Sequence, residues 1–175
     1  GEWPHEIFHT RANYVSAKRV IDTVLVVLSL PLTLPLVSAL YLAVLIADGR
    51  PALFWQWRDG LHGKPFRMLK LRTMRVQREA SAPSFTGHDD VRVTRLGRLL
   101  RRTRLDELPQ LWNVLRGEMS LIGPRPEQTE FVRQFRGEIP MFDLRHNVRP
   151  GITGWAQVQQ GYAANVDDSR QKLCF

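Results

Sequence analysis

The sequence is poor in cysteine, and its acidic residues are outnumbered by basic ones. Its one cysteine, Cys174, excludes an internal disulfide and a cysteine metal cluster. There are 17 Asp and Glu residues against 25 Lys and Arg residues, so the formal net charge is +8. This imbalance predicts an anionic partner: nucleic acid, anionic lipid or a phosphorylated substrate. Internal repeats, low-complexity tracts and the pattern of a cleavable signal peptide are also lacking. The length suits one domain with a membrane appendage.

A nearly continuous apolar segment covers residues 20–47. As one straight helix it would be about 42 Å long, more than the roughly 30 Å of a hydrocarbon core. Pro31 and Pro35 lie near its middle, however, and basic residues flank both ends, which favours both ends in the cytoplasm. The pattern alone fits a proline-kinked transmembrane helix or a helix-break-helix hairpin in one leaflet. In the hairpin, three hydroxyls would satisfy carbonyls freed at the break: those of Ser29, Thr33 and Ser38.

The segment that follows predicts a β-hairpin and then amphipathic helices. Residues 53–55 and 66–71 are strand-like, with turn-forming glycine steps at 59–63 between them. A short basic helix is expected after an N-cap at Thr94, with its basic face on anionic headgroups. A second amphipathic helix is predicted at 127–136.

Two adjacent carboxylates, Asp106 and Glu107, stand among arginines. Thr103 is a good N-cap, and apolar residues at helical spacing lead to Gly117, a natural C-cap. We therefore predict that both acids lie in the first turn of a helix, which Pro109 would kink. Helical neighbours point about 100° apart, so the acids cannot face one ligand equivalently, which suggests two roles rather than a shared proton. The alternative is that they only complement the helix dipole.

Two arginines are candidate anion ligands. Arg125 stands between two prolines, and such a restricted guanidinium suits a phosphate or a carboxylate. Arg149 precedes a proline and two nearby glycines, which permit close approach of the backbone to a ligand. The run His88, Asp89 and Asp90 is a weak metal candidate, because contiguous residues rarely converge on one ion.

The run LDELPQLWNVLRGEMSLIGPRPE resembles the signature of the bacterial monotopic phosphoglycosyl transferases, as do KLRTM at 70–74 and RPGITGWAQ at 149–157. The resemblance implies an enzyme of the bacterial inner membrane, with its catalytic domain on the cytoplasmic face. The implied fold is α+β: a re-entrant membrane hairpin, then a small, mainly helical cytosolic catalytic domain with a short β-hairpin and interfacial amphipathic helices. Residues 1–17 would be an interfacial segment or the remnant of a longer N-terminal region, 18–49 the hairpin and 50–175 the catalytic domain.

The same resemblance implies the chemistry. A sugar 1-phosphate passes from a nucleotide diphosphate sugar, such as a UDP-hexose, to polyprenyl (undecaprenyl) phosphate. Asp106 would be the nucleophile of a covalent phosphosugar intermediate, and Glu107 would assist through a metal or a proton. Both acids would hold Mg²⁺. The phosphate-binding residues would be Lys70, Arg72, Arg125 and Arg149. The other partners are one membrane leaflet and, as an option, a second copy in a homodimer; nucleic acid is not expected.

One position departs from the family pattern, and two other functions stay open. Relatives often have a small polar residue where Arg104 stands, so this chain loses a cap or gains a phosphate contact. A basic, membrane-anchored module that binds lipid or nucleic acid would show basic helices without a paired-acid site. A diphosphatase would use water as the acceptor.

Overall fold

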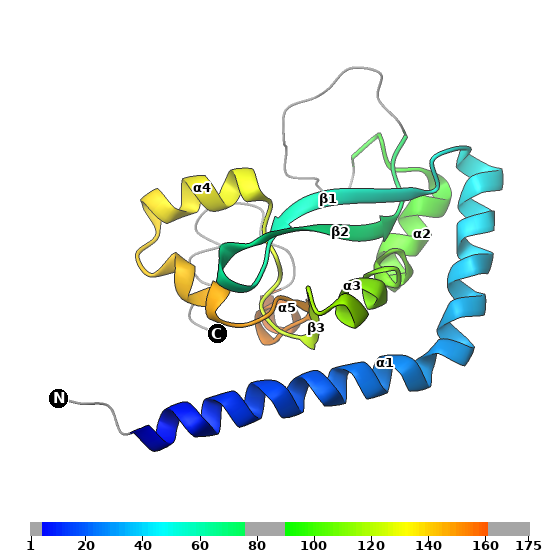
Figure 1. The fold of residues 1–175 in the computed structure, drawn as a ribbon. Helices are drawn as coiled ribbons and strands as arrows, with labels where there is room; N and C mark the ends of the chain where they lie inside the picture. The colour runs from blue at the N-terminus through cyan, green and yellow to red at the C-terminus, as the bar shows by residue number, and fades with distance from the viewer. Residues whose placement is uncertain (1–4, 76–89, 161–175) are drawn as a thin grey trace.

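The computed structural model describes residues 5–75 and 90–160, and its α+β fold agrees with the prediction. A long helix supports a small domain built on a β-hairpin and short helices (Figure 1). In chain order the elements are α1 (His5–Asp48), β1 (Leu53–Asp59), η1 (Leu61–Gly63), β2 (Pro65–Leu71), α2 (Arg95–Thr103), η2 (Leu105–Glu107), α3 (Gln110–Arg116), β3 (Ser120–Ile122), α4 (Thr129–Glu138), η3 (Phe142–Asn147), β4 (Gly151–Thr153) and α5 (Trp155–Gln160), where η denotes a short 3₁₀ helix.

Helix α1 is bent near its middle, where Pro31 and Pro35 lie, and continues through the bend (Figure 1). The predicted interruption is therefore a kink inside one helix, as expected when proline removes a backbone donor without ending the hydrogen-bonded turns around it. We call residues 5–30 the first limb and 36–48 the second limb. The first limb begins before the predicted boundary at residue 18.

The hydroxyls near the bend do form backbone hydrogen bonds, but not to the expected carbonyls. Each donates to a carbonyl three or four residues earlier: Ser29 to Val26, Thr33 to Ser29 and Ser38 to Leu34. The carbonyls that lose a helical partner are those four residues before each proline, Val27 and Pro31. The hydroxyls thus reinforce neighbouring turns instead.

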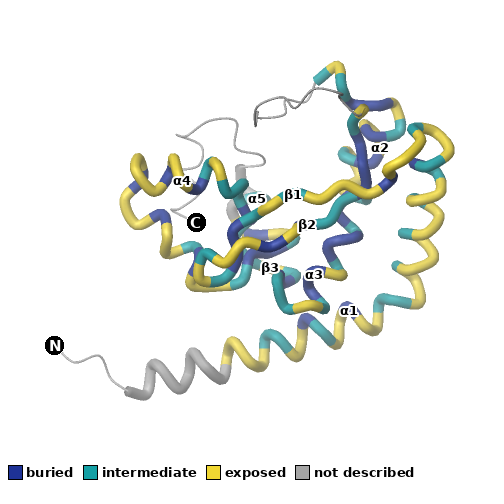
Figure 2. Tube along the Cα trace, turned by 45° about the horizontal axis from the view of Figure 1, so that its top comes forward, coloured by how far each residue is buried: buried dark blue, intermediate teal, exposed yellow. Residues whose placement is uncertain are grey.

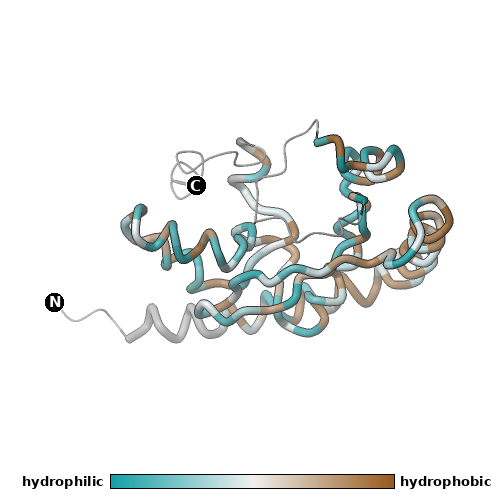
Figure 3. The backbone as a smooth tube through the Cα atoms, turned by 90° about the horizontal axis from the view of Figure 1, so that it is seen from above, coloured by the Kyte–Doolittle hydropathy of each residue, from teal (hydrophilic) through white to brown (hydrophobic). Residues whose placement is uncertain are grey.

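Much of α1 exposes apolar side chains. Residues Tyr14–Asp48 are long and apolar enough to cross a membrane. Figure 2 shows the outer side of the helix as exposed, and Figure 3 shows the second limb as strongly hydrophobic. Val26 and Val44 are exceptions, because each is buried against the rest of the protein.

Both limbs of α1 dock on the same domain. Val26 packs with Phe66 and Met119, whereas Val44 packs with Leu71 and Leu100. Apolar contacts therefore hold both sides of the bend against β2 and its neighbours.

Polar contacts strengthen both docking points. In the first limb, the Asp22 carboxylate accepts from the Ser120 hydroxyl at 2.6 Å and from the Leu121 N–H at 3.3 Å. At the end of the second limb, the Thr94 hydroxyl donates to the Asp48 carboxylate at 2.9 Å. Both ends of the apolar segment are thus fixed to one domain.

The predicted β-hairpin is confirmed. Strands β1 and β2 pair antiparallel, with Trp55 opposite Leu69, and η1 forms the connection. The free edge of β2 is bound by the buried Asn113 of α3, which accepts from the Leu69 N–H at 3.1 Å and donates to the Arg67 carbonyl at 2.8 Å. This amide fixes the hairpin to α3.

The region between α2 and α3 corrects one prediction. Thr94 caps α2 as expected, because its hydroxyl accepts from the Gly97 N–H at 2.9 Å. Thr103 is not an N-cap: it is the last residue of α2, and its hydroxyl donates to the Leu99 carbonyl at 2.9 Å. The helix ends because Arg104 adopts the left-handed conformation, with φ of 60°.

The acids consequently lie in the separate turn η2, not in the first turn of the following helix. Pro109 starts α3 instead of kinking it, as suits a residue that has no N–H to donate. Gly117 ends α3 in the left-handed conformation, as predicted. Helix α4 corresponds to the helix expected at 127–136, and it buries Val132 and Phe135.

Candidate active site

The two adjacent acids lie in η2, which packs against β2. Their exposed fractions are only 6% for Asp106 and 4% for Glu107. Successive residues of a 3₁₀ turn point about 120° apart, so the acids face different surroundings. The expectation of two unequal acids therefore survives, although the helix expected around them does not.

Glu107 is surrounded by cations. Its Oε1 atom lies 3.1 Å from Lys70 Nζ, 3.0 Å from Arg125 Nη2 and 3.8 Å from Arg104 Nη1. Burial favours the neutral acid, but Lys70 and Arg125 outweigh it and lower the pKa of Glu107 to about 2. Glu107 is therefore ionised at neutral pH. Arg104 belongs to this group of cations.

Asp106 has the opposite environment. Its Oδ1 atom is buried and accepts no hydrogen bond from any residue that the structure describes. Burial raises the pKa of Asp106, and the charge of Glu107 adds to the effect, while Lys70 and Arg101 oppose it. Arg101 is held by the Thr73 hydroxyl, which accepts from its Nε at 2.8 Å. Among the described residues, Asp106 thus has one buried carboxylate oxygen without a hydrogen-bond partner.

The cations also affect one another. Burial, assisted by Arg125, lowers the pKa of Lys70 to about 8. Burial also lowers the pKa of Arg58 to about 10, with Glu127 opposing and Arg125 contributing. Cations that lie so close together repel one another, and a nearby anion relieves this repulsion. The site therefore favours the binding of an additional negatively charged group.

Two predicted phosphate ligands lie outside this group. The Arg72 guanidinium donates to the carbonyls of Asp48 and Gly49, at the C-terminal end of α1. Arg149 Nε donates to the Gly117 carbonyl at 3.0 Å, beyond the end of α3. Both side chains cap helix ends, where cations interact favourably with the dipole. Their role as phosphate ligands remains a prediction.

The sequence analysis did not assign Arg58, Arg101 or Arg145 to the site. Arg58 is on the same face of the hairpin as Lys70. Lys70 pairs across the ladder with Phe54, and residues 54 and 58 of β1 are an even number of positions apart. Strand alternation therefore gave a signal for Arg58 that could have been used. No comparable local signal marks Arg145, which lies in η3, far along the chain.

Magnesium suits the two acids better than a metal with a full protein ligand set. Within residues 5–75 and 90–160, no group of three or more Asp, Glu, His and Cys side chains could hold an ion. Mg²⁺ commonly binds one or two carboxylates and completes its shell with phosphate oxygens and water. The unpartnered Asp106 oxygen fits such a site. Of the other metal candidates, His88 and Asp89 lie outside the described residues, and Asp90 pairs with Arg92.

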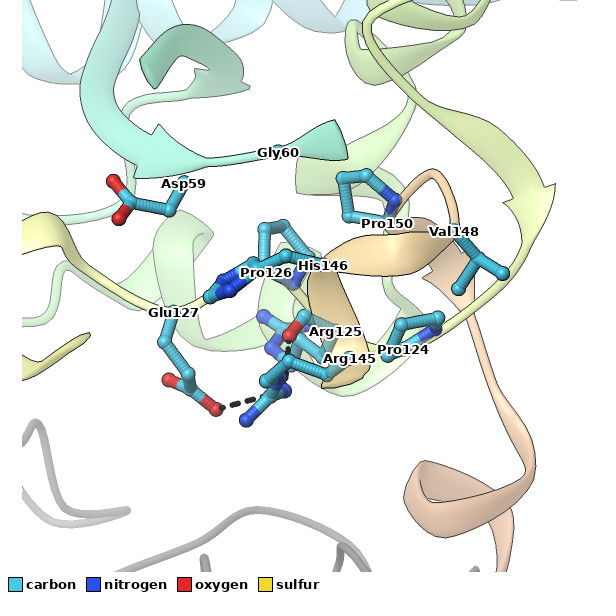
Figure 4. A pocket seen from close by; sticks show the side chains of 10 residues that line it. All are labelled: Asp59, Gly60, Pro124, Arg125, Pro126, Glu127, Arg145, His146, Val148 and Pro150. Atoms are coloured by element: carbon cyan, nitrogen blue, oxygen red, sulfur yellow. Dashed lines mark hydrogen bonds and ion pairs between the residues drawn. The ribbon is translucent and has the colours of Figure 1, made fainter. Parts of the chain in front are cut away.

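A small polar pocket adjoins the segment that carries Arg125 (Figure 4). Arg145 reaches across it, with its Nη2 atom 3.7 Å from Glu127 Oε1 and 2.7 Å from the Arg125 carbonyl oxygen. The pocket wall therefore supports the backbone of Arg125 through the Arg145 side chain.

Comparison with known proteins identifies the family. Residues 13–174 match the model of the family described as Bacterial sugar transferase. The chain belongs to this family. The match confirms the resemblance predicted from the run around the two acids. In this chain, the run contributes the acids and Arg125 to the buried site.

Three curated relatives each contain a region that is similar to this chain. The chain is 48% identical over 160 residues to the UDP-N-acetylgalactosamine-undecaprenyl-phosphate N-acetylgalactosaminephosphotransferase of Aeromonas hydrophila, covering 91% of the chain and 38% of the relative. It is 45% and 44% identical to the UDP-glucose:undecaprenyl-phosphate glucose-1-phosphate transferases of Caulobacter vibrioides (strain ATCC 19089 / CIP 103742 / CB 15) and Escherichia coli (strain K12), covering 89% and 86% of the chain. It spans 59% and 32% of those two proteins.

Proposed function

We propose that this chain transfers a sugar 1-phosphate from a UDP-sugar to undecaprenyl phosphate, with Asp106 as the covalent nucleophile. The observation that carries the proposal is the contrast between the acids: Glu107 is bound by cations, whereas buried Asp106 keeps one oxygen that no described residue bonds. The names of the relatives supply the substrate classes, since each names undecaprenyl phosphate, together with UDP-N-acetylgalactosamine or UDP-glucose.

The proposed reaction uses one carboxylate oxygen of Asp106. An Asp106 oxygen attacks the phosphorus that bears the sugar, and a new O–P bond forms an acyl phosphate. The bond from that phosphorus to the bridging oxygen breaks, and its electron pair leaves with UMP. A phosphate oxygen of undecaprenyl phosphate then attacks the same phosphorus. Asp106 is released as a carboxylate, and undecaprenyl diphosphate sugar is formed.

The surrounding cations suit the negative charge of this reaction. Lys70, Arg125 and Arg101 lie near the acids and would stabilise the diphosphate and the charge on the departing UMP. When bound, Mg²⁺ would be held by Asp106 and Glu107 and would supply further charge neutralisation. Glu107, ionised at neutral pH, keeps Lys70 and Arg125 in place for the substrate.

For the membrane segment we propose the re-entrant arrangement, with both ends of α1 on the cytoplasmic side. The support is that Asp22 in the first limb and Asp48 in the second limb are both bonded to the same polar domain. A spanning helix would have to release one of these contacts. The exposed arginines of α2, next to the second limb, would face anionic headgroups. A homodimer remains a prediction.

Mass spectrometry tests the covalent step. The protein is incubated with UDP-sugar and Mg²⁺ but without undecaprenyl phosphate, and its peptides are analysed. A phosphosugar adduct is expected on the peptide that contains Asp106. It should be absent from Asp106→Asn and should form more slowly in Glu107→Gln. An adduct that persists in Asp106→Asn would refute the assignment, and UMP release by wild type with no adduct would favour direct hydrolysis.

Cysteine labelling tests the topology. In a Cys174→Ser background, single cysteines replace Ser16 and Arg50, which flank the apolar segment. A membrane-impermeant thiol reagent applied to intact spheroplasts should leave both unlabelled and should label both after lysis. Labelling of position 16 alone in intact cells would restore a spanning helix.

A further inference from the structure

The backbone carbonyls of the segment that carries Arg125 are all hydrogen-bonded. Each carbonyl from Pro124 to Gln128 accepts a hydrogen bond. In chain order the donors are the Gly151 N–H, the Arg145 side chain, the Arg58 side chain, the Asp59 N–H and the Val132 N–H. Two consecutive carbonyls, those of Arg125 and Pro126, are therefore held by arginine side chains from distant parts of the chain. The backbone on both sides of the Arg125 side chain is fixed.

Arg145 holds the first of these carbonyls. Its guanidinium donates to the Arg125 carbonyl at 2.7 Å and lies near Glu127 (Figure 4). It also stacks over the Phe142 ring, with its central carbon 4.9 Å from the ring centre. The side chain is only 11% exposed. Burial lowers the pKa of Arg145, and Glu127 opposes this effect. These contacts leave the side chain little freedom to turn toward another partner.

Arg58 holds the second carbonyl. Its Nη1 donates to the Pro126 carbonyl at 3.1 Å, and its Nη2 donates to Gln56 Oε1 at 2.8 Å. Gln56 in turn donates to the Gln128 side chain at 2.7 Å. Two neighbouring side chains on one face of β1, those of Gln56 and Arg58, therefore bind residues 126–128 by hydrogen bonds.

Buried cations beside Arg125 are a costly way to satisfy two carbonyls, because burial and mutual repulsion both disfavour them. We propose that Arg58 and Arg145 are positioning residues: by holding the two carbonyls that follow the Arg125 α-carbon, those of Arg125 and Pro126, they keep the Arg125 guanidinium on Glu107 and directed at the anionic substrate. The proposal rests on the proposed function, because it assigns Arg125 to phosphate binding.

Loss of either arginine should therefore lower activity by displacing the Arg125 side chain. The substitutions Arg58→Met and Arg145→Met remove the donors while keeping an unbranched side chain that packs. Because a displacement of about 1 Å can cost roughly 100-fold in rate, we expect kcat/KM for the UDP-sugar to fall by about 10- to 100-fold. Arg136→Met is the matched control: Arg136 also contacts η3, through Asp143, but is 43% exposed. Its kcat/KM should stay within about twofold of wild type.

A double-mutant cycle separates positioning from a general loss of stability. In an Arg125→Met background, Arg58→Met and Arg145→Met should have little further effect on kcat/KM, because the group that they position is gone. Equal factors in both backgrounds would overturn the proposal. If either variant fails to fold, Gln56→Met loosens Arg58 without changing the charge of the site. It should lower kcat/KM roughly fivefold, only when Arg125 is present.

Binding of inorganic pyrophosphate, measured by calorimetry, gives a readout that needs no turnover. Weaker binding in Arg58→Met and Arg145→Met, but not in Arg136→Met, would support the proposal even if no UDP-sugar released UMP. In that case the proposed function would fail alone. Unchanged pyrophosphate binding with normal turnover in both variants would overturn the positioning role alone. A wild-type chain that neither turns over nor binds pyrophosphate would overturn both.

Discussion

The charge of Glu107 should be a main source of stability in the substrate-free protein. The substitution Glu107→Gln keeps the shape of the side chain but leaves Lys70 and Arg125, at 3.1 and 3.0 Å, without a buried counter-ion. Relative to the ordinary value of 4.5, a pKa of about 2 for Glu107 corresponds to about 3 kcal/mol of stability at pH 7. For a chain of this size, that loss lowers Tm by roughly 10 °C.

The pH dependence follows from the sign of the pKa change. A carboxyl whose pKa is lowered by folding stabilises the protein above its unfolded pKa, and this contribution is lost as the pH falls through the folded value. The difference in Tm between wild type and Glu107→Gln should therefore be full at pH 7. It should shrink between pH 4.5 and about 2.

Tryptophan fluorescence during heating measures the effect, with the whole chain in detergent and without Mg²⁺ or UDP-sugar. The control is Asp143→Asn, which removes a carboxylate with a 2.7 Å ion pair to Arg136 but 60% exposure. An exposed pair of this kind is worth about 0.5 kcal/mol or less, so its Tm should change little. Equal losses in the two variants would refute the reasoning, as would a Glu107→Gln difference that persists at pH 2.

Three further predictions follow from the same geometry. Asp106→Asn should raise Tm at pH 7, because folding raises the pKa of Asp106 and the ionised form is disfavoured. The gain should disappear in acid, as melts at both pH values will show. In pH–rate profiles, kcat/KM for the UDP-sugar should fall as Lys70 loses its proton near pH 8, and Lys70→Arg should move this fall to higher pH. Gly97→Ala should lower the free energy of unfolding by at least about 2 kcal/mol, because the new Cβ would lie 2.1 Å from the Thr73 carbonyl oxygen. The control Gly137→Ala meets nothing within 4 Å and should raise the free energy of unfolding by about 0.5–1 kcal/mol. Denaturant unfolding measures both.

Features set by neighbouring residues were predictable from the sequence. Strand propensity on each side of a glycine-rich turn predicted β1 and β2, and Thr94 and Gly117 were correctly placed as caps. The exception is Thr103, whose side chain is equally suited to begin a helix or to bond back within one. The left-handed turn at Arg104 decided between these outcomes, and no residue preference for that conformation marks it in the sequence.

The sequence by itself determined that this chain has an apolar, proline-containing helix, a β-hairpin and two adjacent acids among arginines. Only the tertiary structure decided which cation meets which anion: Lys70 and Arg125 reach Glu107, while Arg72 and Arg149 cap helix ends. The physical reason is that a guanidinium or ammonium group can pair with any nearby carboxylate or carbonyl, and local spacing carries no information about partners brought close by folding.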